Sequence, residues 1–379
     1  MTRSAGRAGV SGAPRSVDVA QLAGVSQKTV SRVFNDEAYV SAEVRKRVLD
    51  AADELGYRLN HAARALASGR TRSIGVVTLG TALYGPASLL IGIERAARDT
   101  GYALRVVNTL EGDPGGVGGA IASLLEQGVD GIVISEPIDE EGDGGAVPAD
   151  VRVPVLVLGA PVATTGPGTV VAGVGADLLA RAATEHLLDL GHRTVHHLAG
   201  PQRWYAARDR LRGWREALEA RGCDEPSVVE GDWSAASGYA AGRVLAADPG
   251  VTAVFAANDD MAIGLVRALT EAGRAVPDDV SVVGFDDIPV AAFVTPPLTT
   301  VRQPFDAVAQ EGLRLLVHAI EKPGADLPPA NDPPVELVLR ASTAPAPSRT
   351  HPGGAPGSAV PPRPGAKTAP QSGGLSDRS

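Results

Sequence analysis

After residue 70 the chain repeats one pattern in two successive sets, a short run rich in Val and Ile followed by a helical stretch. The first set contains "SIGVVTL" before "LLIGIERAARDTG", "LRVVNT" before "GGAIASLLEQG", and the runs "DGIVIS" and "VPVLVLG". The second set extends from "TVVAGV" at residue 169 to "VSVVGFDD" at residue 280, with four helical stretches between its strands. Continuous apolar strands separated by helices are typical of parallel sheets that are buried on both faces. The sequence therefore predicts two Rossmann-like α/β lobes.

The flanks of these two sets complete the predicted organisation. The run "LTTVRQP", the helix "FDAVAQEGLRLLVHAI" and the strand "VELVLR" finish a body that we place at residues 73–340. From residue 341 to residue 379 the composition turns to Pro, Gly and Ser without apolar periodicity, which predicts a disordered tail. We expect residues 1–15 to form a disordered leader, residues 16–60 a helical domain and residues 61–72 a linker.

Cysteine usage and hydropathy limit where such a chain works. Cys223 is the single cysteine, so neither an internal disulfide nor a cysteine-based metal cage is possible. No apolar run approaches the roughly 20 residues that span a membrane, and the Arg-containing leader is not followed by the apolar core of a signal peptide. These features predict a cytoplasmic protein without a membrane anchor.

The net charge of −9 hides an asymmetry between the two ends of the chain. Residues 1–70 hold 11 basic and 7 acidic residues, a balance of +4, which leaves −13 for the remainder. A small basic module on an acidic body fits a partner that carries phosphates, although a solvated charged face would give the same balance.

The stretch "VDVAQLAGVSQKTVSRVFND" lies in this basic module and predicts two short helices that meet at a corner. Ser16 and Ser26 are placed to cap the helices, and Gly24 and Val25 form the corner. The predicted shared core consists of Val17, Ala20, Leu22, Val25, Val30 and Val33. The outer face of the second helix then carries Gln27, Lys28, Thr29, Ser31 and Arg32. Amide and cationic groups near a helix N-terminus are suited to read base edges in a major groove, whereas the alternative is a polar surface helix in an ordinary helical corner.

In this stretch the chain resembles the lactose/galactose repressor family, LacI/GalR. The likeness continues through "VSAEVRKRVLDAADELGYRLNHAARALASGRT", "HLLDLGHRTVHHLAGP", "FAANDDMAIGLVRAL" and "PPLTTVRQP" to about residue 340. The resemblance implies an N-terminal all-α helix-turn-helix domain, a hinge helix and a two-lobed body like that of periplasmic binding proteins. It also implies a homodimeric repressor that an effector releases from a palindromic DNA operator.

The resemblance also assigns DNA contacts to single residues. Gln27, Lys28 and Arg32 take the positions that read bases, whereas hydroxyl and amide groups would contact phosphates from Ser26, Thr29, Ser31 and Asn35. Leu66, beside Ala63, matches a leucine that wedges into the minor groove at the operator centre, and Asn60 belongs to the same contact set. Leu59 stands where the family usually has Pro, which leaves the stiffness of the hinge entry open.

An effector site is expected in the cleft between the lobes, where loops at the ends of the strands converge. The runs "ALYGP", "RLRGW" and "GDWSAASG" resemble the lactose-repressor branch of the family most. By that resemblance the effector contacts are Leu83, Pro86, Arg210, Trp233, Asn258, Asp286 and Phe305. Polar groups beside an aromatic ring suit a neutral sugar, and a purine is another possible stacking partner.

Two departures from that branch change the expected effector. Gly159 stands where the branch has an acidic sugar contact, and Glu111 stands about where it has a basic one. The hydroxyl pattern recognised here should therefore differ, and we expect a glycoside or oligosaccharide without naming it.

Other motifs carry weaker functional signals. "GVGADL" lacks the third Gly of a dinucleotide fingerprint, because Leu178 takes its place. The histidines at 186, 192, 196 and 197 fall on a helix, a corner and a strand with alternating faces, so we expect no metal site there. The adjacent pairs Asp259–Asp260 and Asp286–Asp287 follow strands, where helix capping or hydroxyl binding accounts for them.

We therefore expect neither a cofactor nor an enzyme, since no pair of nucleophile and base stands out. The partners expected are operator DNA, a small effector and a second copy of the chain, and the place of action is the nucleoid in the cytoplasm. The tail lacks leucine heptads, so no assembly beyond a dimer is predicted. The rival from another class is a solute-binding receptor, which shares the two-lobed body but has no DNA-binding module. The sequence leaves open which effector binds, whether it induces or co-represses, and which genes are regulated.

Overall fold

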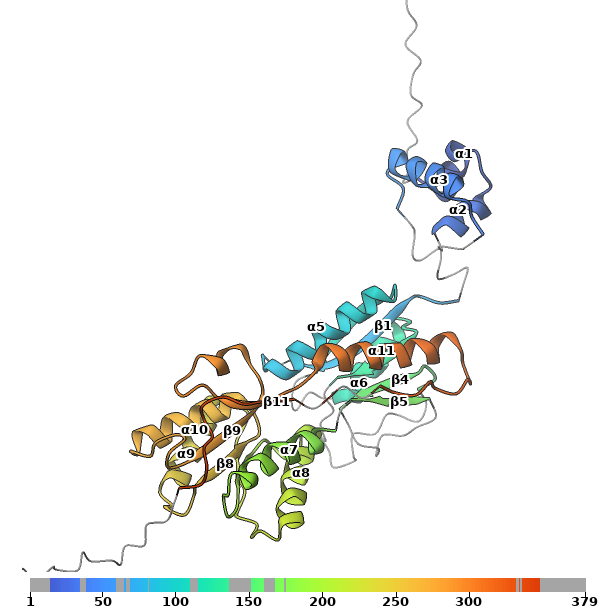
Figure 1. Ribbon diagram of the computed structural model, residues 1–379. Helices are drawn as coiled ribbons and strands as arrows, with labels where there is room; N and C mark the ends of the chain where they lie inside the picture. Colours follow the sequence, from blue (N-terminus) through green and yellow to red (C-terminus); the bar gives the residue numbers. More distant parts are fainter. Residues whose placement is uncertain are drawn as a thin grey trace, which may run out of the picture.

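The computed structural model describes residues 14–34, 39–58, 65, 69–80, 82–109, 115–135, 151–159, 168–173, 175–331, 334 and 336–347. These residues form a unit of three helices and a larger body with two sheets (Figure 1). Within these ranges, no helix combines the length and the apolar character needed to cross a bilayer.

Three helices make up the N-terminal unit, namely α1 (Ser16–Ala23), α2 (Gln27–Phe34) and α3 (Ala42–Leu55). Their shared core consists of Val19, Ala20, Ala23, Val30, Val33, Val48, Ala51 and Ala52. The prediction that Val17 and Leu22 belong to this core was wrong, because both are more than 40% exposed. In a helix that begins at Ser16, positions 19, 20 and 23 lie on one face, and that face packs on α3.

The two predicted helix caps have different outcomes. The Ser26 hydroxyl accepts the Thr29 amide proton at 3.1 Å, as predicted for the start of α2. Ser16 is instead the first residue of α1, and the Arg15 N–H donates to the Asp18 carboxylate at 2.8 Å. The Ser16 hydroxyl accepts a hydrogen bond from the Gln27 side-chain amide at 2.8 Å, which ties the two helices together.

The first lobe contains five parallel strands in the order β2-β1-β3-β4-β5. Their bounds are β1 (Ser73–Leu79), β2 (Ala103–Thr109), β3 (Gly131–Ile134), β4 (Val155–Leu158) and β5 (Thr169–Ala172). Helices α5 (Tyr84–Asp99), α6 (Gly116–Glu126) and α11 (Phe305–Glu321) pack on this sheet, and α5 lies against α11. Every residue of β1 is buried, as its unbroken apolar run predicts. The same prediction was wrong for β2, because β2 is the outer strand of the sheet and most of its residues are exposed or half-buried.

The second lobe has a sheet in the order β11-β10-β9-β8-β6-β7. Its strands are β6 (His196–Ala199), β7 (Val229–Glu230), β8 (Ala253–Ala256), β9 (Ser281–Asp286), β10 (Thr299–Arg302) and β11 (Glu336–Val338), and only β11 runs antiparallel. The helical elements of this lobe are α7 (Ala176–Asp189), α8 (Tyr205–Arg221), α9 (Ala235–Ala246), α10 (Asp259–Glu271) and η2 (Pro289–Ala292).

The chain crosses between the lobes at places that the sequence pattern does not mark. The run at 169–172, assigned above to the second set, forms β5 and pairs with β4 of the first sheet. Likewise α11 returns to the first lobe, and β11 goes back to the second. An apolar run predicts a strand but not which sheet provides its neighbours, so the boundary between the sets was misplaced.

The body also extends beyond the predicted boundary at residue 340. Ser342 is fully buried, and its hydroxyl donates to the Val282 carbonyl and accepts the Thr299 amide proton. The Ala346 N–H donates to the Leu190 carbonyl at 2.9 Å. Residues 341–347 therefore belong to the body, because side-chain and backbone hydrogen bonds hold them where apolar periodicity is absent.

Candidate ligand cleft and nucleic-acid interface

Two adjoining cavities lie where the carboxyl ends of the strands of both lobes meet. The first, which we call the polar chamber, has a volume of about 30 Å³. It is lined by Leu83, Tyr84, Gly85, Pro86, Trp204, Ala206, Arg210, Trp233, Asn258, Asp286 and Gln303. Six of the seven expected effector residues therefore share one small space, and only Phe305 lies outside its lining.

The polar chamber is organised around Arg210 on α8 and Asp286 at the end of β9. Arg210 Nη2 lies 3.6 Å from Asp286 Oδ1, and both side chains are less than 10% exposed. Gln303 Nε2 donates to the same carboxylate oxygen at 2.6 Å. Burial raises the pKa of Asp286 to about 6, and the opposite charge of Arg210 acts against this rise. The pair presents both donors and acceptors in a site from which water is largely excluded.

Trp233 forms one wall of the chamber in a strained backbone conformation. Its φ of +73° lies in the left-handed region, which costs a bulky residue on the order of 1–3 kcal/mol. The indole packs edge to face on Trp204 with ring centroids 5.6 Å apart, and the Arg210 guanidinium lies 5.3 Å from its centroid. A Cβ at Gly200 would lie 2.2 Å from this ring, so only glycine fits there.

Two polar groups beside this wall differ in what they have left to offer a ligand. The buried Trp233 Nε1 has no hydrogen-bond partner in the described part of the chain, which leaves a donor at the wall. Asn258 is largely occupied, since its Oδ1 accepts the Met261 N–H at the start of α10 and its Nδ2 donates to the Trp233 carbonyl. Only one amide hydrogen and one lone pair of Asn258 remain for a ligand.

The neighbouring carboxyl groups are held by the protein itself. Asp259 accepts hydrogen bonds from the Ile288 N–H at 2.9 Å and the Thr300 hydroxyl at 2.6 Å, and burial together with Asp286 raises its pKa to about 8. Asp287 instead pairs with Arg302 and Arg340, which hold the pKa of that carboxyl below its ordinary value despite burial. This arrangement stabilises strand ends and a helix start rather than positioning two carboxylates across a scissile bond.

The second cavity, which we call the apolar chamber, has a volume of about 50 Å³ and shares Ala206, Arg210 and Gln303 with the first. Most of its other lining is aliphatic or aromatic and includes Leu89, Leu158, Leu179, Phe305 and Val308. Gly159 contributes no side chain, and a Cβ built there would meet nothing within 4 Å. The junction thus offers a polar space and an apolar space in series, separated by Arg210 and Gln303.

Five lining residues of the polar chamber were missed by the sequence analysis, and three of them carry an aromatic ring or an amide. Trp204 precedes α8, Tyr84 begins α5, and Gln303 follows β10. The Tyr84 ring also lies edge to face against Phe305 at 6.1 Å, which links the two chambers on the first-lobe side. The rule that loops after parallel strands line such clefts would have selected Trp204 and Gln303 from the sequence.

The histidines considered as metal ligands have other surroundings. His197 stacks between Trp214 and Phe255 in the core, and burial lowers its pKa to about 4. His192 contacts the hydroxyls of Thr252 and Ser281. Among the described residues, no group of three or more His, Cys, Asp or Glu is arranged to hold a metal ion.

The candidate nucleic-acid interface is the outer face of α2. Gln27, Lys28, Ser31 and Arg32 are exposed, whereas Val30 and Val33 of the same helix are buried. The hydroxyls of Ser26 and Thr29 lie 2.9 Å apart at the helix start. The predicted contacts Asn35, Asn60, Ala63 and Leu66, and the sugar-site departure Glu111, lie outside the described residues.

Comparisons with known proteins match both parts of the chain. A model of bacterial regulatory proteins, lacI family, matches residues 17–60, and a model of a periplasmic binding protein-like domain matches residues 184–343. The lactose operon repressor of Escherichia coli (strain K12) is 36% identical over 327 residues, which cover 86% of this chain and 89% of that protein.

Two solved structures are similar over most of the chain. A lac repressor dimer bound to operator and the anti-inducer ONPF is 35% identical with a TM-score of 0.73, and the match covers 86% of this chain and 98% of that one. A complex of the transcriptional regulator CelR with cellobiose is 33% identical with a TM-score of 0.61, and the match covers 87% and 99%.

Proposed function

The chain belongs to the lacI family of bacterial regulatory proteins, and from that premise we propose that it is a sugar-responsive transcriptional repressor. One observation carries the proposal: a three-helix unit with an exposed polar recognition face is joined to a body that encloses a polar chamber between two lobes. DNA binding and effector binding thus reside in one chain. We place its action in the cytoplasm, at the nucleoid, and assign it no enzymatic role.

The DNA half of the proposal rests on α2. Gln27 and Lys28 at its start, and Arg32 one turn later, would read base edges in a major groove, where amide and cationic groups make bidentate contacts. Ser26, Thr29 and Ser31 would contact phosphates and fix the position of the helix. The Gln27 side-chain amide donates to the Ser16 hydroxyl, and Gln27 would exchange this bond for a base on binding DNA.

The effector half rests on the chemistry of the two chambers. Arg210 and Asp286 would bind ring hydroxyls in the polar chamber, and Trp233 would stack on the C–H face of a sugar. The apolar chamber behind Arg210 and Gln303 would receive a second ring or an apolar aglycone. A glycoside or oligosaccharide has both parts, and one relative was solved with cellobiose.

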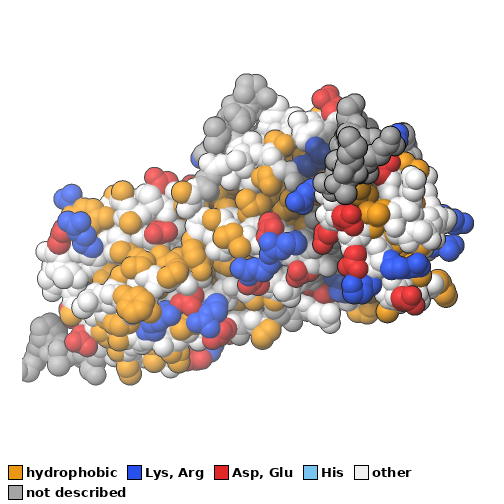
Figure 2. Space-filling view, turned by 90° about the horizontal axis from the view of Figure 1, so that it is seen from above, with side chains coloured by type: hydrophobic (Ala, Val, Ile, Leu, Met, Phe, Trp, Pro, Cys, Tyr) orange, Lys and Arg blue, Asp and Glu red, His pale blue; other side chains and the backbone are white. Residues whose placement is uncertain are grey.

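A dimer is proposed because a related lac repressor was solved as a dimer on its operator. In Figure 1, α5 and the segment after β9 lie along the upper side of the body, and Figure 2 shows apolar side chains gathered on the face seen from above. Ile91 of α5 is 56% exposed, and Phe293 after η2 is 84% exposed. Pairing through this face would engage both lobes, so their relative motion could alter the spacing of two DNA-binding units.

Repression then follows from linkage between two sites. The connection to the DNA-binding unit leaves the first lobe directly before β1, whereas most polar effector contacts belong to the second lobe. An effector that favours one arrangement of the lobes would change operator affinity, typically by about 1–3 kcal/mol, and DNA would change effector affinity by the same amount.

The test is fluorescence anisotropy of the full chain on its own upstream DNA at fixed salt, titrated with galactosides, glucosides, cellobiose and purines. We expect the protein to bind its operator more tightly than random DNA, and we expect one glycoside to weaken this binding. Lys28→Ala should reduce the ratio of the affinities for operator and random DNA. Tighter operator binding in the presence of a purine would show that the effector is a co-repressor and not an inducing sugar. The absence of any sequence preference would overturn the repressor and favour a solute-binding receptor.

A further inference from the structure

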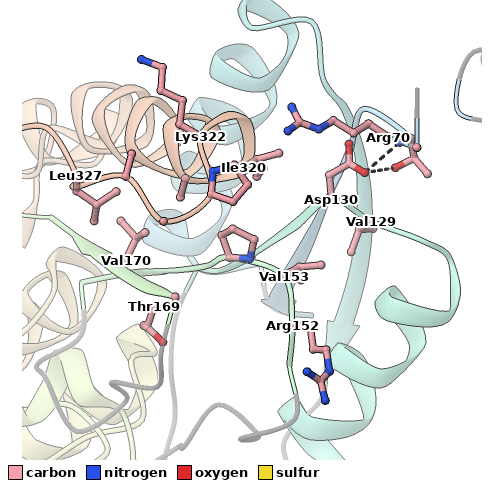
Figure 3. A pocket seen from close by; sticks show the side chains of 18 of the residues that line it. Arg70, Val129, Asp130, Arg152, Val153, Thr169, Val170, Ile320, Lys322 and Leu327 are labelled. Atoms are coloured by element: carbon pink, nitrogen blue, oxygen red, sulfur yellow. Dashed lines mark hydrogen bonds between the residues drawn. The ribbon is translucent and has the colours of Figure 1, made fainter. Parts of the chain in front are cut away.

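A third and larger hollow lies at the amino ends of strands in the first sheet, on the side remote from the two chambers. It has a volume of about 880 Å³ and is formed by the amino ends of β3, β4 and β5, the end of α11 and the segment after it (Figure 3). Residues 69–71, which lead from the helical unit to β1, line the same hollow. We call it the basal groove, and none of the expected effector contacts lies in it.

Three cations surround the basal groove. Figure 3 places Arg70, Arg152 and Lys322 on different sides of it, and they come from three separate segments of the chain. Within the described residues, Arg152 and Lys322 take part in no ion pair, and both are exposed. This concentration of positive charge runs against the composition of the body, which is strongly acidic.

Asp130, the one carboxylate in the described lining of the groove, is already engaged. Asp130 accepts hydrogen bonds from the Thr71 N–H, the Thr71 hydroxyl and the Arg72 N–H at 2.8 to 3.0 Å. These neutral donors stabilise the carboxylate charge and direct it toward the backbone of the connection rather than toward the cations. An anion that enters the groove would therefore meet two cations, Arg152 and Lys322, that pair with no carboxylate of the described residues.

The floor of the groove is apolar. Ile320, Val170 and Val129 are each at most 5% exposed, and Val153 and Leu327 complete the walls. A cationic rim above an apolar floor matches a sugar–phosphate backbone, because the phosphate oxygens are anionic and the deoxyribose C–H groups are not polar.

The position of the groove selects the source of that backbone. Residues 59–68 connect the helical unit to Gly69, and ten residues span at most about 33–36 Å even when fully extended. DNA held by α2 is therefore kept near the groove at a high effective concentration, which no free phosphate shares.

We propose that the basal groove of the first lobe is a second DNA contact that binds the operator's sugar–phosphate backbone through Arg152 and Lys322. This inference rests on the proposed function, since it needs the helical unit to hold an operator. The contact would add affinity without sequence preference and would couple the body directly to the DNA. An effector that moves the first lobe would then weaken this contact as well as the DNA contacts of the helical units.

The experiment compares the full-length wild type with Arg152→Ala, Lys322→Ala and the double variant on one operator fragment, from 50 to 200 mM salt. The slope of log K against log salt is negative, and each lost phosphate contact makes it less steep by about 0.9. Each single variant should therefore make the slope less steep by about 1.8 in a dimer, which loses two contacts. The wild type should then lose about tenfold more affinity than a single variant over this range. Arg152→Lys should restore most of the slope.

The matched control is Arg193→Ala, which removes an exposed guanidinium that pairs with Asp224 in the second lobe. It should leave the slope unchanged. Equal slopes for wild type and double variant would overturn the basal contact while leaving the repressor intact, whereas a wild type that binds no operator would overturn the repressor itself. A melting-temperature shift with ATP, without DNA, that the double variant loses would assign the groove to free organic phosphates instead.

Discussion

The two lobes contribute opposite chemistry to the cleft between them. The second lobe supplies Arg210, Asp286, Asn258 and the two tryptophans, and these groups hold one another through hydrogen bonds, ring contacts and an ion pair. The first lobe supplies Leu83, Pro86, Leu89 and Leu158, which have no polar side-chain atoms, and adds only the hydroxyls of Tyr84 and Ser135 from its described residues. We therefore propose that the second lobe fixes the identity and orientation of a ligand, whereas the first lobe covers it and responds to it.

A similar contrast separates the chambers from the basal groove. The chambers are small and lined by buried groups whose positions are fixed, whereas the groove is more than ten times larger and carries exposed cations on flexible side chains. Selectivity requires fixed polar groups, because each misplaced hydrogen bond in a buried site costs on the order of 1–3 kcal/mol. Electrostatic contact with a phosphate backbone requires only charge in reach. The size of a cavity is therefore a poor guide to which site discriminates between ligands.

Arg210→Ala should have the largest effect on the contrast between the lobes. The loss of a buried, charge-assisted anchor should raise the effector concentration needed for operator release by at least about 100-fold, with operator affinity itself retained. Anisotropy titrations on operator DNA measure both quantities. Arg215→Ala on the same helix, which loses only a surface pair with Glu225, is the control and should respond as the wild type does. Release of the Arg210→Ala variant at wild-type effector concentrations would show that the second lobe is not the anchor.

Trp233→Leu tests the aromatic wall of the same lobe. Removal of the stacking surface and of the Nε1 donor should weaken effector binding by roughly thirtyfold, since an aromatic contact and one hydrogen bond are each worth about 1 kcal/mol. Quenching of tryptophan fluorescence by the effector should decrease in the variant. Unchanged affinity and quenching would indicate that Trp233 serves the core alone.

Leu83→Ala probes the covering lobe and should have a smaller effect. We expect a three- to tenfold loss of effector affinity, about 1 kcal/mol for apolar contact area, with the order of preference among sugars preserved. Isothermal titration of the full chain with a panel of glycosides measures both affinity and order. Leu339→Ala, at a residue that is 63% exposed, is the control and should change neither. A loss as large as that of Arg210→Ala, or a reordered preference, would break the division between the lobes.

The pH dependence of stability tests the buried polar network of the second lobe. The pKa of Asp259 is raised from 3.8 to about 8, so the folded protein keeps a proton that the unfolded chain releases near pH 4. The stability that this group contributes is complete below pH 4 and is lost as the pH rises through 8. The unfolding free energy of wild type minus that of Asp259→Asn should thus fall from pH 5 to pH 8, by at most about 1.4 kcal/mol per pH unit. Urea unfolding at four pH values measures it, and a constant difference would contradict a buried protonated Asp259.

Several features of the fold and of the candidate site were predictable because they depend on local pattern. The alternation of apolar and helical runs predicted two α/β lobes, and the Ser26 cap and the exposed face of α2 followed from short-range spacing. Arg210, Trp233 and Asp286 were selected by family resemblance, and the structure brings them into one chamber, while their roles remain predictions. Tyr84 was not found, because nothing in its immediate sequence distinguishes a residue that faces the cleft from one that faces solvent.

The sequence by itself determined which segments form strands and helices, which helix carries cations and amides outward, and which residues end the strands. Tertiary structure alone decided that the run at 169–172 joins the first sheet, that α11 returns to it, and that residues 341–347 are held in the body. It also decided that Asp259 lies deep enough, and close enough to Asp286, for its pKa to rise. The physical reason is that hydrophobic periodicity encodes whether a residue is buried, whereas its partners and its electrostatic surroundings depend on segments far away in the chain.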